Sequence, residues 1–332
     1  MMPEILPWQS AIWQHLSASI VSRRIPQAIL LSGTAGLGKR RLADVYAAAL
    51  LCQSPLSSGL ACGICSACKL FLANTHSDYL LIEPDEPGKA IGIDKVRQLT
   101  VKLALKPQFS AYRVVIFQPA DSLNNHSANA FLKCLEEPGE RTAFILISQQ
   151  PAKLPATIRS RCQKFHCTSP DKQLAEQWLL QQGVTQDAAL LLKMSQGAPL
   201  LAKSYADQQL IALKVEFFQA WLQVAEGKQS FLAVAEHWQK QDRVDLAVLL
   251  LWLISAIKDI LKLAYQLDPA EIDNPDFKKP LQALAQRLEL KAVFNYYDKL
   301  LTSRSLLATQ VNKQLLLERL IIDWYELNSP CI

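Results

Sequence analysis

Short apolar runs alternate with longer amphipathic stretches over the first half of the chain. Each run is β-branched or otherwise apolar over four or five residues and is bounded by polar residues, which is typical of a strand buried in a parallel sheet. The stretches between the runs carry apolar residues at helical spacing, so the order is that of an α/β domain. We predict strands at residues 28–31, 79–82, 114–117 and 143–147, and helices at residues 41–51, 93–105 and 127–137.

From about Ser169 onward these runs are absent and the pattern is helical. Leu, Ala, Gln and Lys recur at 3.6-residue spacing, which predicts an all-α second half. The segment Gly197-Ala-Pro199 interrupts this pattern, because Gly and Pro end helices. A chain of 332 residues also exceeds the usual size of one hydrophobic core. We therefore predict three domains: an α/β domain over residues 1–168, a small helical domain over 169–207 and an all-helical domain over 208–332.

The overall charge and hydropathy restrict where the protein works. The net charge of +5 is small and is dispersed along the chain, so it permits contact with nucleic acid without indicating it. The longest apolar run, residues 246–257, is too short to cross a bilayer and predicts a buried helix. The first ten residues, MMPEILPWQS, lack the basic stretch and apolar core of a secretory signal. We expect a cytoplasmic protein without a membrane partner.

Half of the eight cysteines lie close together, at Cys52, Cys62, Cys65 and Cys68. In a reducing compartment such clustering indicates a metal rather than disulfides. Two overlapping CxxC pairs and one further thiolate supply the tetrahedral sulfur set of a structural Zn²⁺ site, with no open position for catalysis. A redox thiol pair would need only one CxxC, and nothing else here suggests the chemistry of an iron–sulfur cluster. We predict a zinc module at about residues 52–68, and core thiols at Cys162 and Cys167.

A glycine-rich loop follows the first predicted strand and precedes a predicted helix, the context of a Walker A phosphate-binding loop. Its sequence is Gly33-Thr-Ala-Gly-Leu-Gly-Lys39, with the other glycines at Gly36 and Gly38. In such a loop the backbone N–H groups surround phosphates and Lys39 reaches the β and γ oxygens. The next residue should carry a hydroxyl that binds Mg²⁺, but it is Arg40, which has no acceptor lone pair.

The strand that should end in an acidic Walker B pair runs instead into Gln118 and Pro119. Neither residue binds Mg²⁺ strongly or polarises an attacking water, and Asp121 lies too far along the turn to replace them. With Arg40, this removes two independent parts of the hydrolytic site, so we expect no ATP hydrolysis by the chain alone. Two interpretations of the loop remain open: it binds nucleotide without hydrolysis, or it is only a tight strand-to-helix turn in which Lys39 is solvated or paired.

Several segments occur together in an order that resembles one family. They are Arg24-Ile-Pro-Gln-Ala-Ile-Leu-Leu-Ser-Gly33, the cysteine module directly after the P-loop helix, Leu135-Glu-Glu-Pro138, and Ser160-Arg-Cys162 followed by Phe165-His166. Over roughly residues 20–168 these segments resemble the clamp-loader subunits of bacterial DNA polymerase III, which are AAA+ proteins. The resemblance implies an AAA+ P-loop domain with a parallel sheet and an inserted zinc module, then a small helical lid domain and an all-α C-terminal collar domain used for oligomerisation.

Within that family the motor subunits gamma and tau keep complete Walker motifs, whereas other members have lost them. This chain follows the second pattern, and it has Leu200 where the family's ATPases place a sensor arginine. The resemblance implies a non-hydrolysing subunit that joins the motor subunits and delta, and so acts indirectly on the sliding clamp and on primer-template DNA. It also implies that Arg161 is an arginine finger, which stabilises the γ-phosphate charge in the neighbouring subunit's ATP site. Without the motif, Arg161 would be interpreted as a solvated or salt-bridged arginine.

Two other functions compete with this one. A zinc-dependent nucleic-acid-binding module would need basic and aromatic residues around the cysteines, where only Lys69 and Phe71 are close. The tryptophans of the helical half lack interleaved basic clusters, so we predict that residues 221, 238, 252 and 324 are core or interface residues. An active gamma/tau-like motor ATPase would turn over ATP as an isolated chain, and it is disfavoured at Arg40, Gln118, Pro119 and Leu200.

Overall fold

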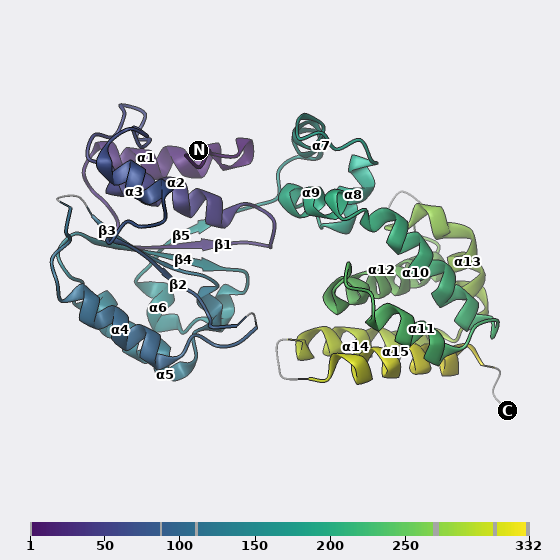
Figure 1. Ribbon diagram of the computed structural model, residues 1–332. Coiled ribbons are helices and arrows are strands. Elements are labelled where there is room, and N and C mark those ends of the chain that lie inside the picture. The colour runs from purple at the N-terminus through teal and green to yellow at the C-terminus, as the bar shows by residue number, and fades with distance from the viewer. Residues whose placement is uncertain (1, 87, 110–111, 268–271, 308–310, 330–332) are drawn as a thin grey trace. The chain divides into compact units, whose positions relative to one another are not determined.

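The computed structural model describes residues 2–86, 88–109, 112–267, 272–307 and 311–329. It divides into two compact units (Figure 1). The sheet unit comprises Met1–Gln181 with Gly197–Leu201, and the helical unit comprises Gln182–Gln196 with Ala202–Ile332. An α/β first half and an all-α second half are thus confirmed. The three-domain division with boundaries near 168 and 208 stays a prediction.

The sheet unit is built on five parallel strands among the described residues, in the order β2-β3-β4-β1-β5. The four apolar runs predicted as strands form β1 to β4, with ends that agree within one residue. The fifth strand was not predicted, because it lies at an edge of the sheet and three of its four residues are exposed, so it has no apolar run. The bounds are β1 (Ala28–Ser32), β2 (Tyr79–Ile82), β3 (Arg113–Phe117), β4 (Thr142–Ser148) and β5 (Gln163–His166).

Helices accompany both faces of this sheet. The three predicted helices correspond to α2, α4 and α5 below, with ends that differ by at most two residues. Helix α5 begins where it does because the side chain of Asn124 accepts a hydrogen bond from the Ser127 N–H at 2.8 Å, which caps the first turn. The helices are α1 (Ser10–Val21), α2 (Lys39–Leu51), α3 (Ser66–Leu72), α4 (Ile93–Leu103), α5 (Asn125–Glu136), α6 (Ala156–Ser160) and α7 (Lys172–Gln181), with 3₁₀ turns η1 (Pro7–Gln9), η2 (Ala120–Ser122) and η3 (Pro151–Lys153).

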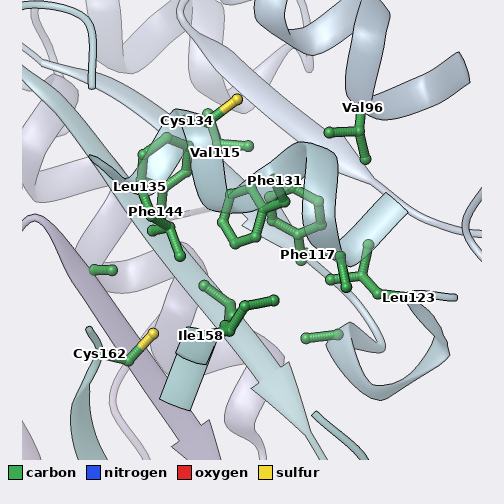
Figure 2. Close-up of a cluster of buried hydrophobic side chains, with 14 of the residues drawn as sticks. Val96, Val115, Phe117, Leu123, Phe131, Cys134, Leu135, Phe144, Ile158 and Cys162 are labelled. Atoms are coloured by element: carbon green, nitrogen blue, oxygen red, sulfur yellow. The ribbon is translucent and has the colours of Figure 1, made fainter. Parts of the chain in front are cut away.

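Successive residues of the central strands face opposite sides of the sheet, and each side has its own core. Leu31 of β1 packs with side chains of α1 and α2, whereas the adjacent Leu30 packs with side chains of α4, α5 and α6. On the second side the ring of Phe131 lies between those of Phe117 and Phe144, at centroid distances of 4.4 and 5.2 Å (Figure 2). These two cores fix the carboxyl ends of β1 and β3, which carry the glycine-rich loop and Gln118.

The helical unit packs around a pair of tryptophans. The rings of Trp221 and Trp324 stack with centroids 3.9 Å apart, and the Trp324 indole N–H donates to the Trp221 carbonyl oxygen at 3.0 Å. All four tryptophans discussed above are buried, as predicted for core residues. Helix α9 (Pro199–Asp207) is shared between the units, and the other elements are α8 (Ala188–Met194), α10 (Leu210–Ala225), α11 (Phe231–Gln239), α12 (Leu246–Ala264), η5 (Pro275–Phe277), α13 (Lys278–Arg287), α14 (Leu290–Leu306) and α15 (Lys313–Asn328).

The long apolar run predicted as a buried helix lies in α12, most of whose residues are buried. Within the described ranges, no helix combines the length and the apolar character that a bilayer crossing requires.

Candidate functional site

The glycine-rich loop connects β1 to α2 in a conformation that requires glycine. Gly36 and Gly38 have φ angles of 76° and 78°, in the left-handed region that other residues rarely adopt. A Cβ atom on Gly36 would lie 2.5 Å from the Cβ of Leu201, and one on Gly38 would lie 2.8 Å from Nε2 of Gln9. Both the turn and the close approach of other segments therefore exclude larger residues at these two positions.

Lys39 is folded back onto the loop that precedes it. Its Nζ donates to the carbonyl oxygens of Gly33 and Thr34, each at 2.6 Å, and only 5% of the residue is exposed. Burial lowers the pKa of Lys39, although Cys167 and Asp121 act in the opposite direction. The ammonium that a Walker A loop would offer to phosphate oxygens is thus hydrogen-bonded to the chain itself.

The outside of the loop is covered by two other segments. Gln9 Nε2 donates to the carbonyl oxygens of Leu37 at 3.0 Å and Gly38 at 2.8 Å, and the Trp8 indole N–H also donates to Leu37, at 3.0 Å. From α9, the backbone N–H of Leu200 donates to the Gly36 carbonyl oxygen at 3.1 Å. Sequence reasoning missed Trp8 and Gln9, because they lie almost thirty residues before their partners and belong to no motif.

Arg40, at the start of α2, joins that helix to the ends of two strands. Its Nε donates to both carboxylate oxygens of Asp44 at 3.0 Å, and Nη1 donates to Oε1 of Gln118 at 3.0 Å. Nη2 donates to the Tyr79 hydroxyl at 3.1 Å, and that hydroxyl donates to Asp44 at 2.7 Å. Glu83 adds an ion pair at 3.4 Å. The guanidinium therefore lies between the start of α2 and Gln118, the residue that follows β3.

The charges around Arg40 stabilise it where it is. Burial opposes its positive charge, but Asp44 and Tyr79 outweigh that cost and raise the pKa of Arg40. Burial and the Asp44 carboxylate likewise raise the pKa of Tyr79, so its hydroxyl remains a donor. The spacing of Arg40 and Asp44 is that of a helical i,i+4 ion pair, a signal by which the sequence could have identified Asp44.

The four predicted zinc ligands come together in one cluster. Cys52 follows the end of α2, Cys65 caps α3, and Cys68 lies in its first turn. All four Sγ atoms lie within 4.8 Å of one another, and Sγ–Sγ distances are 3.9 Å for Cys52–Cys65 and 4.0 Å for Cys62–Cys68. Zn–S bonds of about 2.3 Å in a tetrahedron require sulfur atoms about 3.8 Å apart. The cluster thus has the composition and size of a closed, structural zinc site.

Backbone donors prepare this cluster for negative charge. The N–H groups of Cys62, Cys65 and Cys68 point to the sulfurs of Cys52, Cys62 and Cys65, at 3.3, 3.4 and 3.4 Å. Backbone N–H groups of Ile64 and Cys65 lower the pKa of Cys62 to about 6, whereas burial raises the pKa of Cys68. A bound cation would bring all four thiols to the thiolate form.

The remaining described cysteines lie in the core. Cys162 and Cys167 are 7% and 3% exposed, and burial raises the pKa of each thiol to about 11. They are therefore the unreactive core thiols that were predicted. Cys331 lies outside the described residues.

Arg161 follows α6 directly and is half exposed. Its Nη1 donates to the carbonyl oxygen of Thr157 at 3.0 Å, and its Nη2 donates to Oε1 of Glu136 at 2.8 Å. The side chains of Arg161 and Glu136 are 41% and 52% exposed. The ion pair links the Ser160-Arg-Cys162 segment to the Leu135-Glu-Glu-Pro138 segment, two of the motifs that carried the family resemblance.

Comparison with known proteins identifies the family. Family profiles described as "DNA polymerase III, delta subunit" and "DNA polymerase III, delta subunit, C terminal" match residues 8–171 and 208–326. A Pseudomonas aeruginosa protein named DNA polymerase III subunit delta' is 35% identical over 334 residues, covering 99% of this chain and 100% of that protein. The chain belongs to the DNA polymerase III delta-prime family.

Two further relatives are also named as subunits of DNA polymerase III. The Escherichia coli K12 protein named DNA polymerase III subunit delta' is 32% identical and covers 95% of this chain and 94% of its own length. A Haemophilus influenzae protein named DNA polymerase III subunit tau/gamma is 34% identical over 209 residues, which are 61% of this chain and 30% of that protein. The resemblance inferred from the ordered motifs is confirmed.

Proposed function

We propose that this delta-prime protein is the non-hydrolysing subunit of the DNA polymerase III clamp loader. In the cytosol it joins the motor subunits gamma and tau to delta, and the complex loads the sliding clamp onto primed DNA. The observation that carries the proposal is the position of the Arg40 guanidinium, between the start of α2 and Gln118 at the end of β3. In a P-loop ATPase, the equivalent residues hold the Mg²⁺ ion.

Three further features oppose ATP hydrolysis at this loop. Lys39 would have to leave two short hydrogen bonds to loop carbonyl oxygens before it could bind phosphate. Leu200 supplies a backbone N–H and an aliphatic side chain where the family's ATPases have a sensor arginine. Gln118 offers one amide oxygen, and Arg40 already occupies it. We therefore assign the glycine-rich loop a structural role, as a tight turn, rather than nucleotide binding.

The chemistry of the subunit then lies with Arg161, which we propose as the arginine finger for the neighbouring subunit's ATP site. It is followed by buried Cys162 and by β5, an edge strand, so its backbone is anchored at the border of the sheet. The bonds to Thr157 and Glu136 use two of the five guanidinium N–H donors. A half-exposed guanidinium with donors remaining is suited to receive the oxygens of a γ-phosphate.

The rest of the chain completes this assembly role. Residues 1–168 form the P-loop-like domain, and zinc held by the cysteine cluster stabilises the segment between α2 and α3. Residues 169–207 form a small lid domain, and residues 208–332 form the collar that joins the neighbouring subunits. A motor ATPase, the competing function, is opposed by the filled magnesium position at Arg40.

The test is ATP turnover by the reconstituted complex of gamma or tau, delta and this chain. With Arg161→Ala, hydrolysis at the one adjoining site should fall by about 10³-fold, and total turnover should fall by the share of that site. Arg161→Lys should restore little, because an ammonium lacks the planar fork. The isolated chain should release no phosphate.

The matched control is Lys164→Ala, which removes an exposed cation from the neighbouring edge strand. It should leave turnover unchanged. Assembly of each variant is checked by size-exclusion chromatography. Normal turnover by an assembled Arg161→Ala complex, or hydrolysis by the isolated chain, would contradict the proposed function.

A further inference from the structure

A pocket of about 230 Å³ within the helical unit has an unusual charge balance. It is lined by side chains of α8, α10, α12 and α14 and by the segment that follows α12. Four of its lining residues are cations and only one is an acid. The cations are Lys193, Lys214, Lys258 and Arg304, and the acid is Asp273.

Lys214 lies at the inner side of this pocket. It is only 6% exposed, and its Nζ lies 5.4 Å from the centroid of the Phe218 ring. Among the described residues, its ammonium has no carboxylate within ion-pair distance and no hydrogen-bond acceptor. A buried ammonium with three donors and only an aromatic face as partner is costly, so the site is suited to a ligand that accepts hydrogen bonds.

Trp252 supplies a second donor without a partner. It lines the same pocket and is 3% exposed, and its buried indole N–H has no hydrogen-bond partner in the described part of the chain. Buried donors of this kind are rare in folded proteins and indicate a missing acceptor. Among the described residues that line the pocket, the groups without a partner on Lys214 and Trp252 are donors, so each calls for an acceptor.

The nearby acids are already engaged. Asp259 accepts hydrogen bonds from the backbone N–H groups of Asp273 and Asn274 at 2.9 and 2.8 Å, and from the Asn274 side chain at 2.7 Å. Asp273 pairs with Lys258 at 3.2 Å and with Lys262 at 3.8 Å. Neither carboxylate lies within ion-pair distance of Lys214, so these acids act on its ammonium only at longer range and form no direct partner for it.

Two of the cations that line the pocket are exposed to solvent. Lys193 and Arg304 are exposed, and Arg304 makes no hydrogen bond or ion pair with the described residues. Lys193 donates to the carbonyl oxygen of Ile272 at 3.1 Å, which uses one of its three donors. An anion entering from solvent would therefore meet cations at the rim as well as at the inner end.

We propose that this pocket binds a phosphate-type tetrahedral oxyanion, with Lys214 and the Trp252 indole at the inner end and Lys193, Lys258 and Arg304 around it. Donors converge from four helices, which suits a group with several oxygen acceptors better than a planar carboxylate. The cavity admits a free phosphate or a terminal phosphate ester. The site is independent of the P-loop and of the proposed arginine finger, so its test does not depend on theirs.

Burial of Lys214 is consistent with this assignment. Burial lowers the pKa of its ammonium to about 8, against the opposing effects of Asp259, Asp273 and Asp276, and Lys193 lowers it further. A bound dianion would stabilise the charged form and raise this pKa. Oxyanion binding should therefore be accompanied by proton uptake when it occurs above about pH 8.

The direct test is isothermal titration calorimetry of the full chain with inorganic phosphate at constant ionic strength. Wild-type protein should show saturable binding, and Lys214→Met, which keeps the side-chain volume, should weaken it at least tenfold. Arg304→Gln, at an exposed position where little stability should be lost, should weaken it several-fold. The matched control is Lys291→Met, an exposed lysine on the same helix as Arg304 but away from the pocket.

Competition experiments identify the source of the oxyanion. Displacement of phosphate by a 5′-phosphorylated oligonucleotide, but not by its unphosphorylated form, would show that the pocket takes a terminal phosphate ester. If neither oligonucleotide displaces phosphate, free phosphate is the ligand. Either of these two results supports the site. Equal affinity in wild type, Lys214→Met and Arg304→Gln, or no saturable binding by wild type, would overturn the proposal.

Sulfate provides a pH-resolved version of the same test, since its charge is constant from neutral to alkaline pH. Lys214 binds an anion only in its protonated form, so affinity for sulfate should be greatest below about pH 8 and fall as pH rises through the pKa of Lys214. Lys214→Met should remove this step. A step of the same size in the variant would show that another group is responsible and would contradict the role of Lys214.

Discussion

The two ends of helix α2 differ in how their charged or ionisable groups are satisfied. One end has cations that are bonded to acceptors of the chain, and the other has thiols that are suited to an added cation. At its start, the cations Lys39 and Arg40 are hydrogen-bonded to acceptors that the chain itself provides, among them Gly33 and Asp44. Just beyond its end, Cys52 belongs to a group of four sulfurs within 4.8 Å of one another, which only a cation can hold together as thiolates. At the first site the chain's own groups satisfy the cations, whereas the second site has the composition and size to bind a metal ion. A recognisable ligand motif is therefore a binding site only where the chain leaves its groups unsatisfied.

Removal of the metal should produce the largest effect in this comparison. Chelation of zinc, or Cys65→Ser, should destabilise the sheet unit by at least about 3 kcal/mol, because the metal is bound by the folded chain alone. For a unit of this size that corresponds to a fall in Tm of about 6–12 °C. Thermal unfolding followed by circular dichroism measures the change, and metal analysis gives the zinc content.

The control for this prediction is Ile64→Ala, at a residue that is 77% exposed and lies in the same loop between Cys62 and Cys65. It should keep the metal and lose little stability. A Cys65→Ser variant with wild-type Tm, or purified protein that contains no metal and is insensitive to chelators, would mean that the cluster is complete as thiols.

Disruption of the Arg40 network should have an intermediate effect. Arg40→Met leaves Gln118 without its donor and Asp44 with only the Tyr79 hydroxyl, so we expect a loss of about 2 kcal/mol, or about 4–8 °C in Tm. The neighbouring Arg41→Met removes a more exposed ion pair to Glu4 and should cost at most about 1 kcal/mol. Urea denaturation compares the two variants, and equal losses would show that the Arg40 contacts add nothing beyond a surface ion pair.

Nucleotide should have the smallest effect. A P-loop open to ATP would be stabilised by about 2.7 kcal/mol at a hundredfold excess over its Kd. Here we expect Mg-ATP to shift Tm by less than about 1 °C, since Lys39 and the covering segments already occupy the loop. A saturable rise in Tm would show that the loop opens to bind nucleotide. It would contradict the view that the groups at the start of α2 are already satisfied by the chain.

Restoring two metal-binding side chains tests whether the start of α2 stays inactive when Arg40 is removed. The double variant Arg40→Thr, Gln118→Asp recreates the residue types of a magnesium site, but Leu200 and the covered loop remain. It should stay without measurable phosphate release. ATP hydrolysis by this variant would show that Arg40 and Gln118 alone prevent hydrolysis at this loop.

The sequence predicted best those features that depend on neighbours close in the chain. Apolar runs identified β1 to β4 within one residue, and the cysteine spacing identified all four members of the cluster, because both signals are local. The residues that differ from a Walker pattern, Arg40 and Gln118, could also be identified from the sequence alone. The contacts of Arg40 could not be predicted in this way, because its partners Gln118 and Tyr79 lie at the ends of other strands.

Features that depend on distant contacts were missed for a physical reason. Trp8 and Gln9 cover the loop through hydrogen bonds to Leu37 and Gly38, and nothing in their local sequence marks them as cover. Lys214 occupies a position in a helical pattern where lysine is normally solvated, so its burial depends on helices far along the chain. The local periodicity of the sequence shows which face of a helix is apolar. It does not show which polar side chains become buried when that face packs against other helices.

The Arg40 guanidinium is covalently joined to the helix that it stabilises, so it has no dissociation rate. A magnesium–nucleotide pair exchanges with solution, and its occupancy follows the cellular supply of ATP. A tethered cation has a fixed effective concentration that no metabolite changes. The start of α2 therefore keeps the same charge through every turnover, and in the proposed complex it would provide a constant neighbour to subunits whose sites fill and empty.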